Sequence, residues 1–274
     1  MGEETPEENG RKMQDNIVIA SRTYKGELYD IAMSFINLPY EKLAFTGTTA
    51  DGYLYRLLNV DADWVINIDE DAFVLSDDEL LNLLDFMRKN EYDFCGMPDG
   101  GVVPIRGANP VVMNPYFNIF NIKKIRKTFH FYKNLYPHLI LKSLYLLLTP
   151  NRKDMLYQML IGMRRNRKLS YLSMAQVTSC TFDENLKQYT PNHLMRHKYE
   201  YVDYEPYYPF FFWLLKQRFR PLYLDARMWE DNISTILYSH NNKPLLIHCW
   251  FAREWHSQQE RYDRAIEYCR SARY

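Results

Sequence analysis

The chain has 274 residues, of which 47% are hydrophobic and 16% aromatic, and this composition predicts one large α/β domain and excludes a disordered chain. Lys plus Arg and Asp plus Glu both total 34, so the net charge excludes a general affinity for nucleic acid. Partners must therefore be sought in local motifs.

Residues 1–14 are polar and lack the basic-then-apolar order of a secretory signal, so we expect a disordered leader. No apolar run reaches the ~20 residues that a membrane-crossing helix needs. The four cysteines form no C-x-x-C pair, which argues against a zinc knuckle or a disulfide framework. A cytoplasmic protein is expected.

In residues 15–122, apolar runs that predict strands alternate with helical patterns. The strands are expected at Asn16–Ala20, Leu43–Phe45, Trp64–Ile68 and Tyr92–Met97, with an extended segment at Val111–Ile122. The helices are expected at Glu27–Ile36, Tyr53–Leu58 and Asp77–Lys89, the last with a capping box of Ser76 and Glu79. This alternation predicts a mostly parallel sheet flanked by helices.

After residue 122 the regular alternation stops. Residues 123–208 carry two basic clusters around the apolar segment Leu139–Leu148 and are expected to form an inserted subdomain that faces the acceptor or a membrane. Residues 209–274 are assigned to the same domain as its acceptor half. The elements expected there are helices at Phe210–Arg218, Asp231–Tyr238 and Glu254–Arg270 and strands at Pro221–Leu224 and Pro244–Phe251.

The main candidate site is the acidic triplet Asp69, Glu70 and Asp71, which directly follows an apolar strand. Three successive carboxylates at a strand end cost stability unless a cation compensates them, and Mn²⁺ or Mg²⁺ suits such oxygen ligands. In an extended segment Asp69 and Asp71 would project to one side and Glu70 to the other. The alternative is a solvated acidic loop before the next helix.

The order of an NIVIA strand, a helix, a second strand and then WVINIDEDAFV resembles the nucleotide-binding half of GT-A glycosyltransferases. This resemblance implies a Rossmann-like GT-A fold in which Asp69 and Asp71 bind the metal that bridges a nucleotide diphosphate. The loop after the first strand contacts the base or ribose in that family. That position corresponds here to Ser21, Arg22, Thr23 and Tyr24.

Glu230 and Asp231 resemble the Glu-Asp motif of inverting, family 2 type transferases. The resemblance implies Asp231 as general base for the acceptor hydroxyl, with Glu230 as the second candidate. Trp229 would form an apolar platform for an acceptor sugar. Alternatively, Asp231 is only the N-cap of the following helix.

His248 lies near the end of the last strand, and a carboxy-terminal His is an additional metal ligand in a number of GT-A enzymes. The other interpretation is a structural histidine. Arg253 could meet the diphosphate, because a guanidinium forks onto phosphate oxygens.

The loop after the fourth strand supplies three further candidates. Asp99 could recognise donor-sugar hydroxyls, and Arg106 could contact the donor, with Asn109 beside it as an acceptor contact. A plain surface arginine is the preferred interpretation of Arg106. The basic clusters around Leu139–Leu148 are interpreted as solvated helix faces or, alternatively, as a peripheral membrane contact.

Together these features predict a metal-dependent glycosyltransferase that moves a sugar from a nucleotide diphosphate donor to a hydroxyl of a glycan or glycolipid. Direct displacement would invert the anomeric configuration. Two alternatives stay open, a nucleotidyltransferase and a non-catalytic carbohydrate-binding protein. A nucleotidyltransferase would normally need a Gly-rich basic phosphate loop, whereas Ser21–Gly26 has two basic residues and one glycine.

Overall fold

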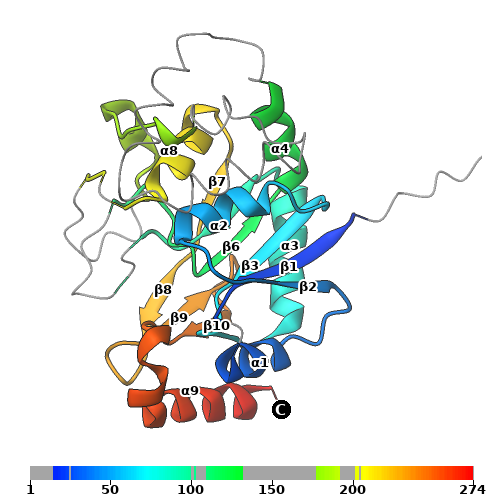
Figure 1. Cartoon of the computed structure of the whole chain (residues 1–274), viewed down its shortest axis with the longest axis vertical. Helices are drawn as coiled ribbons and strands as arrows, with labels where there is room; N and C mark the ends of the chain where they lie inside the picture. Colours follow the sequence, from blue (N-terminus) through cyan, green and yellow to red (C-terminus); the bar gives the residue numbers. More distant parts are fainter. Residues whose placement is uncertain are drawn as a thin grey trace, which may run out of the picture.

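A computed structural model describes residues 15–24, 26–99, 102, 109–131, 177–191, 201–203 and 205–273, with the backbone alone at 130 and 131 (Figure 1). Within these residues two sheets are flanked by helices. The expected α/β class is confirmed. Arg106 and the segment Leu139–Leu148 lie outside the described residues.

The larger sheet has six strands in the order β2-β1-β3-β6-β5-β7 among the described residues. They are β1 (Ile17–Arg22), β2 (Glu41–Phe45), β3 (Trp64–Ile68), β5 (Phe94–Gly96), β6 (Phe117–Phe120) and β7 (Pro221–Tyr223). β1 is parallel to β2 and β3, β5 is parallel to β7, and β6 is antiparallel to both of its neighbours. All strands except β6 therefore point the same way, as expected of a mostly parallel sheet.

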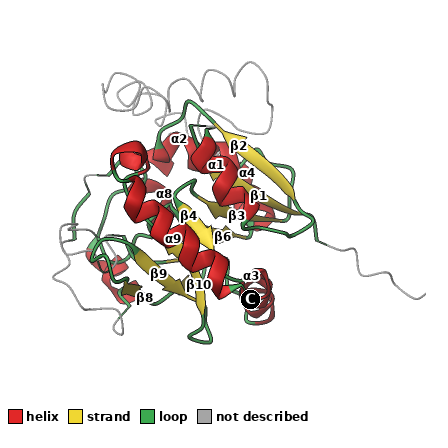
Figure 2. Cartoon of the chain, turned by 90° about the horizontal axis from the view of Figure 1, so that it is seen from below, coloured by secondary structure: helices red, strands yellow, loops and turns green. Residues whose placement is uncertain are grey.

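Helices cover both faces of this sheet because its strands bury side chains in both directions. On one face Ile17, Ile19 and Ile66 share a core with α1 (Glu27–Ser34), α3 (Asp77–Lys89) and α9 (Gln259–Ala272). On the other, Val18 and Val65 pack with α2 (Ala50–Leu57), α4 (Ile122–Phe131) and α8 (Tyr208–Lys216). In Figure 2, as in Figure 1, α9 lies close to α1.

The smaller sheet is antiparallel and has the order β4-β10-β9-β8 among the described residues. Its strands are β4 (Ala72–Val74), β8 (Ala226–Met228), β9 (Thr235–Tyr238) and β10 (Pro244–His248). β4 begins directly after the acidic triplet, whereas β3 of the larger sheet ends directly before it. The triplet is therefore the connection between the two sheets.

The expected helix at Asp231–Tyr238 is wrong, because this segment forms a turn and then strand β9. Asn232 has a φ of 58°, which breaks a helix, and the following residues are largely β-branched or aromatic. The expected terminal helix is divided into a 3₁₀ helix η5 (Ala252–Ser257) and α9. The extended segment expected at Val111–Ile122 contains a strand only at β6.

The subdomain expected at residues 123–208 is described only in part. α4 and the 3₁₀ helix η3 (Glu184–Tyr189) both contribute side chains to the core shared with α2 and α8. In the part of the chain that the structure describes, none of the helices combines the length and the apolar character needed to span a bilayer.

Candidate functional site

The acidic triplet lies at the edge of the larger sheet where the parallel strands end, which is where ligands collect in open α/β sheets. The Tyr116 carbonyl accepts a hydrogen bond of 2.8 Å from the Asp69 amide, and the Asp69 carbonyl accepts one of 3.1 Å from Ala72. The second bond closes a turn. The chain is thus a turn here and not the extended segment that was expected, and each carboxylate has its own partners.

Asp69 pairs with Arg22, whose guanidinium lies 2.8 Å from Oδ2 at the end of β1. Oδ1 of Asp69 is buried and has no hydrogen-bond partner among the described residues. Burial raises the pKa of Asp69 to about 7, with a further contribution from the nearby Asp71 charge and against the opposing effect of Arg22. The negative charge of Asp69 is therefore only partly compensated.

Glu70 holds the loop that follows β1. Its Oε2 accepts hydrogen bonds from the Thr23 hydroxyl and, at 3.0 Å, from the Tyr24 amide. Burial raises the pKa of Glu70, and these two hydrogen bonds oppose that effect. Glu70 thereby fixes the backbone from which the Tyr24 side chain projects, 69% of the residue being exposed.

Asp71 contacts His248, with 3.3 Å between Oδ1 and Nε2. The contact follows from strand register, because β10 pairs with β4 so that His248 stands opposite Ala72. Burial alone would raise the pKa of Asp71, but the charge and hydrogen bond of His248 outweigh it and lower this pKa. The imidazole stacks on Tyr116, with 3.9 Å between ring centroids, and lies 4.3 Å from the Trp250 ring.

These side chains fit a divalent ion as a partial ligand set. Across the described parts of the chain, no three His, Cys, Asp or Glu side chains are grouped closely enough to hold a metal ion by themselves. Mg²⁺ and similar ions are, however, commonly held by one or two carboxylates plus substrate phosphates. Ligands at right angles on an ion at ~2.1 Å lie about 3 Å apart, close to the 3.3 Å between Asp71 and His248. The buried, unpartnered Oδ1 of Asp69 is a third candidate ligand atom.

From the sequence, three adjacent carboxylates are expected to need an added cation to compensate their charge. The structure shows that protein groups already compensate much of it, through Arg22, the Thr23 and Tyr24 donors and His248. The presence of three adjacent carboxylates therefore does not by itself favour a bound cation. The feature that favours one is the incomplete pairing of Asp69 beside the charge on Asp71.

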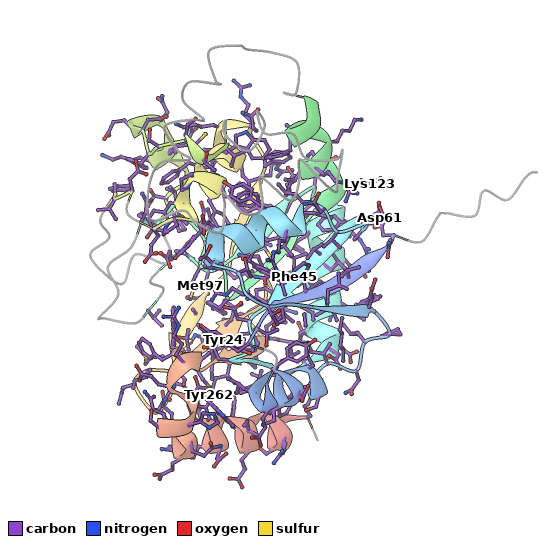
Figure 3. The ribbon with its side chains drawn as sticks, in the orientation of Figure 1. Tyr24, Phe45, Asp61, Met97, Lys123 and Tyr262 are labelled. Atoms are coloured by element: carbon purple, nitrogen blue, oxygen red, sulfur yellow. The ribbon has the colours of Figure 1, made fainter. Side chains whose placement is uncertain are left out.

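Two more predicted donor-site residues, Tyr24 and Arg253, contact each other next to the acidic triplet. Nε of Arg253, from η5, donates a 3.0 Å hydrogen bond to the Tyr24 hydroxyl, so these residues from opposite ends of the sequence are neighbours. Figure 3 shows Tyr24 between Phe45, at the end of β2, and Tyr262 of α9. Ser21, in contrast, is only 1% exposed, and its hydroxyl donates to the Arg22 carbonyl.

Asp99 lies in a buried polar cluster beyond the end of β5. It accepts hydrogen bonds from Asn114 at 2.6 Å and from the Tyr208 hydroxyl at 2.7 Å, and the same hydroxyl accepts a 3.4 Å bond from the Asn109 amide. Oδ1 of Asn114 in turn accepts from the Tyr116 amide at 3.2 Å. The cluster is thereby joined to the backbone of Tyr116, the residue whose ring stacks on His248.

The predicted acceptor residues lie at the turn between β8 and β9. Oδ1 of Asp231 accepts from the Ile233 and Ser234 amides at 3.0 and 2.7 Å, and its Oδ2 accepts from the Ser234 hydroxyl at 2.6 Å. Glu230 forms an ion pair with Arg264 of α9. Trp229 is 9% exposed. Asp231 thus caps a turn rather than a helix, and its carboxylate is engaged there.

Three residues of the site were missed at the sequence level: Tyr116, Trp250 and Asn67. Tyr116 and Trp250 enclose His248. Asn67, fully buried within β3, accepts a 2.7 Å hydrogen bond from the Tyr53 hydroxyl beneath the triplet. A single amide in the otherwise apolar run Trp64–Ile68 was an available signal, because a buried polar group needs partners.

Two basic residues of α4 are paired with carboxylates at the opposite edge of the sheet, where the parallel strands begin. Lys123 contacts Asp63 before β3, and Lys124 contacts Asp93 before β5, both at 2.7 Å. Figure 3 shows Lys123 and Asp61 close together and far from Tyr24. These ion pairs agree with the interpretation of the first basic cluster as a solvated helix face.

The sequence matches no model of a known protein family and no curated protein. Side chains that can bind a cation (Asp69, Asp71 and His248) lie beside side chains that can bind an anion (Arg22 and Arg253). Such a pairing suits a ligand that brings a metal and phosphates together.

Proposed function

We propose that the chain is a metal-dependent glycosyltransferase that moves a sugar from a nucleotide diphosphate donor to a hydroxyl of a glycan or glycolipid acceptor. The observation that carries the proposal is the meeting of Arg22, Asp69, Asp71 and His248 where β1, β3 and β10 end. The mixed sheet is compatible with the GT-A fold that the Asp-x-Asp resemblance implies.

In this proposal the residues divide into a cation side and an anion side. Asp69, Asp71 and His248 would hold Mn²⁺ or Mg²⁺, which when bound offsets charge on the departing diphosphate. Arg22 and Arg253 reach the phosphate oxygens through their guanidinium groups.

Nucleoside recognition falls to the loop after β1. Glu70 fixes this loop through Thr23 and the Tyr24 amide, and the exposed Tyr24 ring offers a surface on which a base can stack. Ser21 supports the strand end rather than facing the ligand, because it is buried. The proposal therefore assigns the base contact to Tyr24.

Asp231 is not proposed as the base that deprotonates the acceptor. Both oxygens of Asp231 accept hydrogen bonds within its turn, and the Arg261 guanidinium lies 3.8 Å from Oδ2. Protein groups therefore already engage both oxygens of this carboxylate. Inversion of the anomeric configuration was inferred with Asp231 as the base, and it is therefore not part of the proposal.

Calorimetric titration of UDP and GDP into the full chain, with Mn²⁺ and with EDTA, tests the proposal. We expect one nucleotide to bind only with the metal, and the matching nucleotide-sugar to be hydrolysed slowly. Glu79→Gln is the matched control. It removes a buried carboxylate on α3 that lies outside the site and pairs with Lys243. This variant should bind nucleotides as the wild type does.

Two other outcomes would replace the proposal. Glycan binding without any metal-dependent nucleotide affinity would favour a carbohydrate-binding protein. Formation of a nucleotide-sugar and pyrophosphate from a nucleoside triphosphate and a sugar phosphate would favour a nucleotidyltransferase.

A further inference from the structure

The ion pair between Arg22 and Asp69 engages one oxygen of the carboxylate that a metal would need. The Arg22 guanidinium lies 2.8 Å from Oδ2 of Asp69 and is also attracted by the charge of Asp71. A divalent ion bound at the same carboxylate would place two further positive charges beside the guanidinium. Like charges a few ångströms apart repel strongly at a partly buried site, so Arg22 and a metal ion compete for Asp69.

Arg22 is placed so that it can move to a second partner. Its side chain is 34% exposed, whereas that of Asp69 is only 10% exposed, so the arginine reaches the carboxylate from the solvent side. The loop residues Thr23 and Tyr24 directly after it are fixed by Glu70. A rotation of the long Arg22 side chain therefore does not require the backbone to move, and a diphosphate arriving from solvent would offer the guanidinium a bidentate partner.

We propose that Arg22 is an exchangeable counter-ion that couples metal binding to diphosphate binding. In the ligand-free protein it neutralises Asp69. When the ligand binds, Arg22 transfers to the diphosphate and releases Asp69 to the metal, so each ligand removes the obstacle to the other. This inference rests on the proposed function and deepens it, because it predicts positive cooperativity and names the residue that causes it.

The test separates metal binding from anion binding. Mn²⁺ binding to the full chain alone is measured by the electron paramagnetic resonance signal of free Mn²⁺. Inorganic pyrophosphate binding is measured by calorimetry with Mn²⁺ and with EDTA. For the wild type we expect pyrophosphate to bind at least about tenfold more tightly with Mn²⁺ than without it, within the usual range of coupling between two sites.

Three variants identify the cause. Arg22→Gln should bind Mn²⁺ alone about tenfold more tightly than the wild type, because Asp69 is released, and its cooperativity should fall by about the same factor. Arg22→Lys keeps a positive charge beside Asp69 and should stay close to the wild type for Mn²⁺ alone. Arg253→Gln is the matched control: Arg253 donates to Tyr24 rather than to a carboxylate, so pyrophosphate should weaken while Mn²⁺ alone is unchanged.

Thermal denaturation confirms that each variant is folded before binding is compared. Unchanged or weaker binding of Mn²⁺ alone by folded Arg22→Gln overturns the counter-ion role, even where the wild type shows metal-dependent nucleotide binding. Equal tightening in Arg22→Lys also overturns it, since the charge would then not be the cause. A wild type that binds neither UDP nor GDP with Mn²⁺ overturns the proposed function and this inference together.

Discussion

Asp71 and His248 come together at the candidate site because Asp71 directly precedes β4 and His248 ends β10, the strand that pairs with β4 in the smaller sheet. The imidazole is fixed by stacking on Tyr116 and by the neighbouring Trp250 ring. Under the proposed function, two ligands held this rigidly would lose little freedom when an ion binds, which is the advantage of preorganisation. Asp71 is therefore the carboxylate whose removal should matter most for the metal.

We predict that Asp71→Asn weakens the Mn²⁺-dependent binding of UDP or GDP by at least about tenfold, the loss typical of a damaged metal site. The amide keeps the shape of the side chain and an oxygen facing His248, so the fold should persist. Calorimetry and circular dichroism check the two statements, with Glu79→Gln as the control. Intact metal-dependent turnover in Asp71→Asn would refute the metal role of this residue.

Gly96 in β5 supports the buried amides beneath the site. Asn118 donates a 3.2 Å hydrogen bond to the Cys95 carbonyl and accepts one of 3.2 Å from Asn67. A Cβ at position 96 would lie 2.5 Å from Nδ2 of Asn118 and 3.0 Å from the Phe117 carbonyl oxygen. An added methyl group must therefore displace a hydrogen-bonded amide.

Gly96→Ala should lower the free energy of unfolding by about 1–3 kcal/mol, the usual cost of overpacking a core. Urea denaturation measures the change. Gly26→Ala is the control, because a Cβ at Gly26 meets no atom within 4 Å, and it should change stability by no more than about half a kcal/mol. Equal stability of both variants would show that the Asn118 amide is not held as described.

At the level of single elements, α3 shows how local residues define a helix. Ser76 caps its first turn by accepting a 3.2 Å hydrogen bond from the Glu79 amide. At the other end the Glu91 amide donates to the Arg88 carbonyl and the Tyr92 amide to the Met87 carbonyl, the two bonds of a Schellman motif. Glu91 takes the left-handed position of that motif, with a φ of 58°.

Glu91→Gly should raise the free energy of unfolding by about 1 kcal/mol, because glycine adopts a left-handed conformation without the Cβ clash. The Glu91 side chain is 86% exposed, so little packing is lost. Glu91→Ala removes the same charge but keeps Cβ, and its stability should stay close to that of the wild type. A stabilisation shared by both variants would attribute the effect to charge instead of backbone conformation.

The elements that could be predicted from sequence are those with a local cause. β3 and α3 have the expected bounds, because an apolar run and a capped amphipathic pattern determine them within a few residues. The helix predicted at Asp231–Tyr238 was wrong because an Asp that accepts a hydrogen bond from the amide three residues later can begin either a helix or a turn. Here it begins a turn. The contact of His248 with Asp71 depends on the pairing of β10 with β4, a long-range register that no local pattern contains.

At the level of the whole molecule, polar contacts between distant segments link the carboxyl-terminal part of the chain to α3 and α9 to the segment that follows β10. Arg273 near the carboxyl end of the chain forms a 2.8 Å ion pair with Asp77 at the start of α3. The Tyr262 hydroxyl of α9 donates a 2.7 Å hydrogen bond to the Trp250 carbonyl. Trp250 and Phe251 have φ angles of 56° and 61°, so α9 stabilises a backbone conformation that is costly for such residues.

Glu79 makes a comparable link between α3 and the turn that joins β9 to β10. Its carboxylate accepts hydrogen bonds from Lys243 at 2.9 Å and from Asn241 at 2.8 Å. Burial alone would raise the pKa of Glu79, but these two partners outweigh it and lower this pKa. A lowered pKa means that the ionised carboxylate stabilises the folded state above the pKa of an unfolded glutamate, about 4.3.

This contribution is lost as the pH falls through the lowered pKa of Glu79 in the folded protein. Glu79→Gln should therefore lower the free energy of unfolding by about 1 kcal/mol at pH 7, the usual value for one hydrogen bond. The difference from the wild type should shrink as the pH is lowered below about 4, where the wild-type carboxylate also becomes neutral. Urea denaturation at a series of pH values measures both; a difference that stays constant on acidification would show that the charge on Glu79 does not stabilise the link between α3 and the turn that joins β9 to β10.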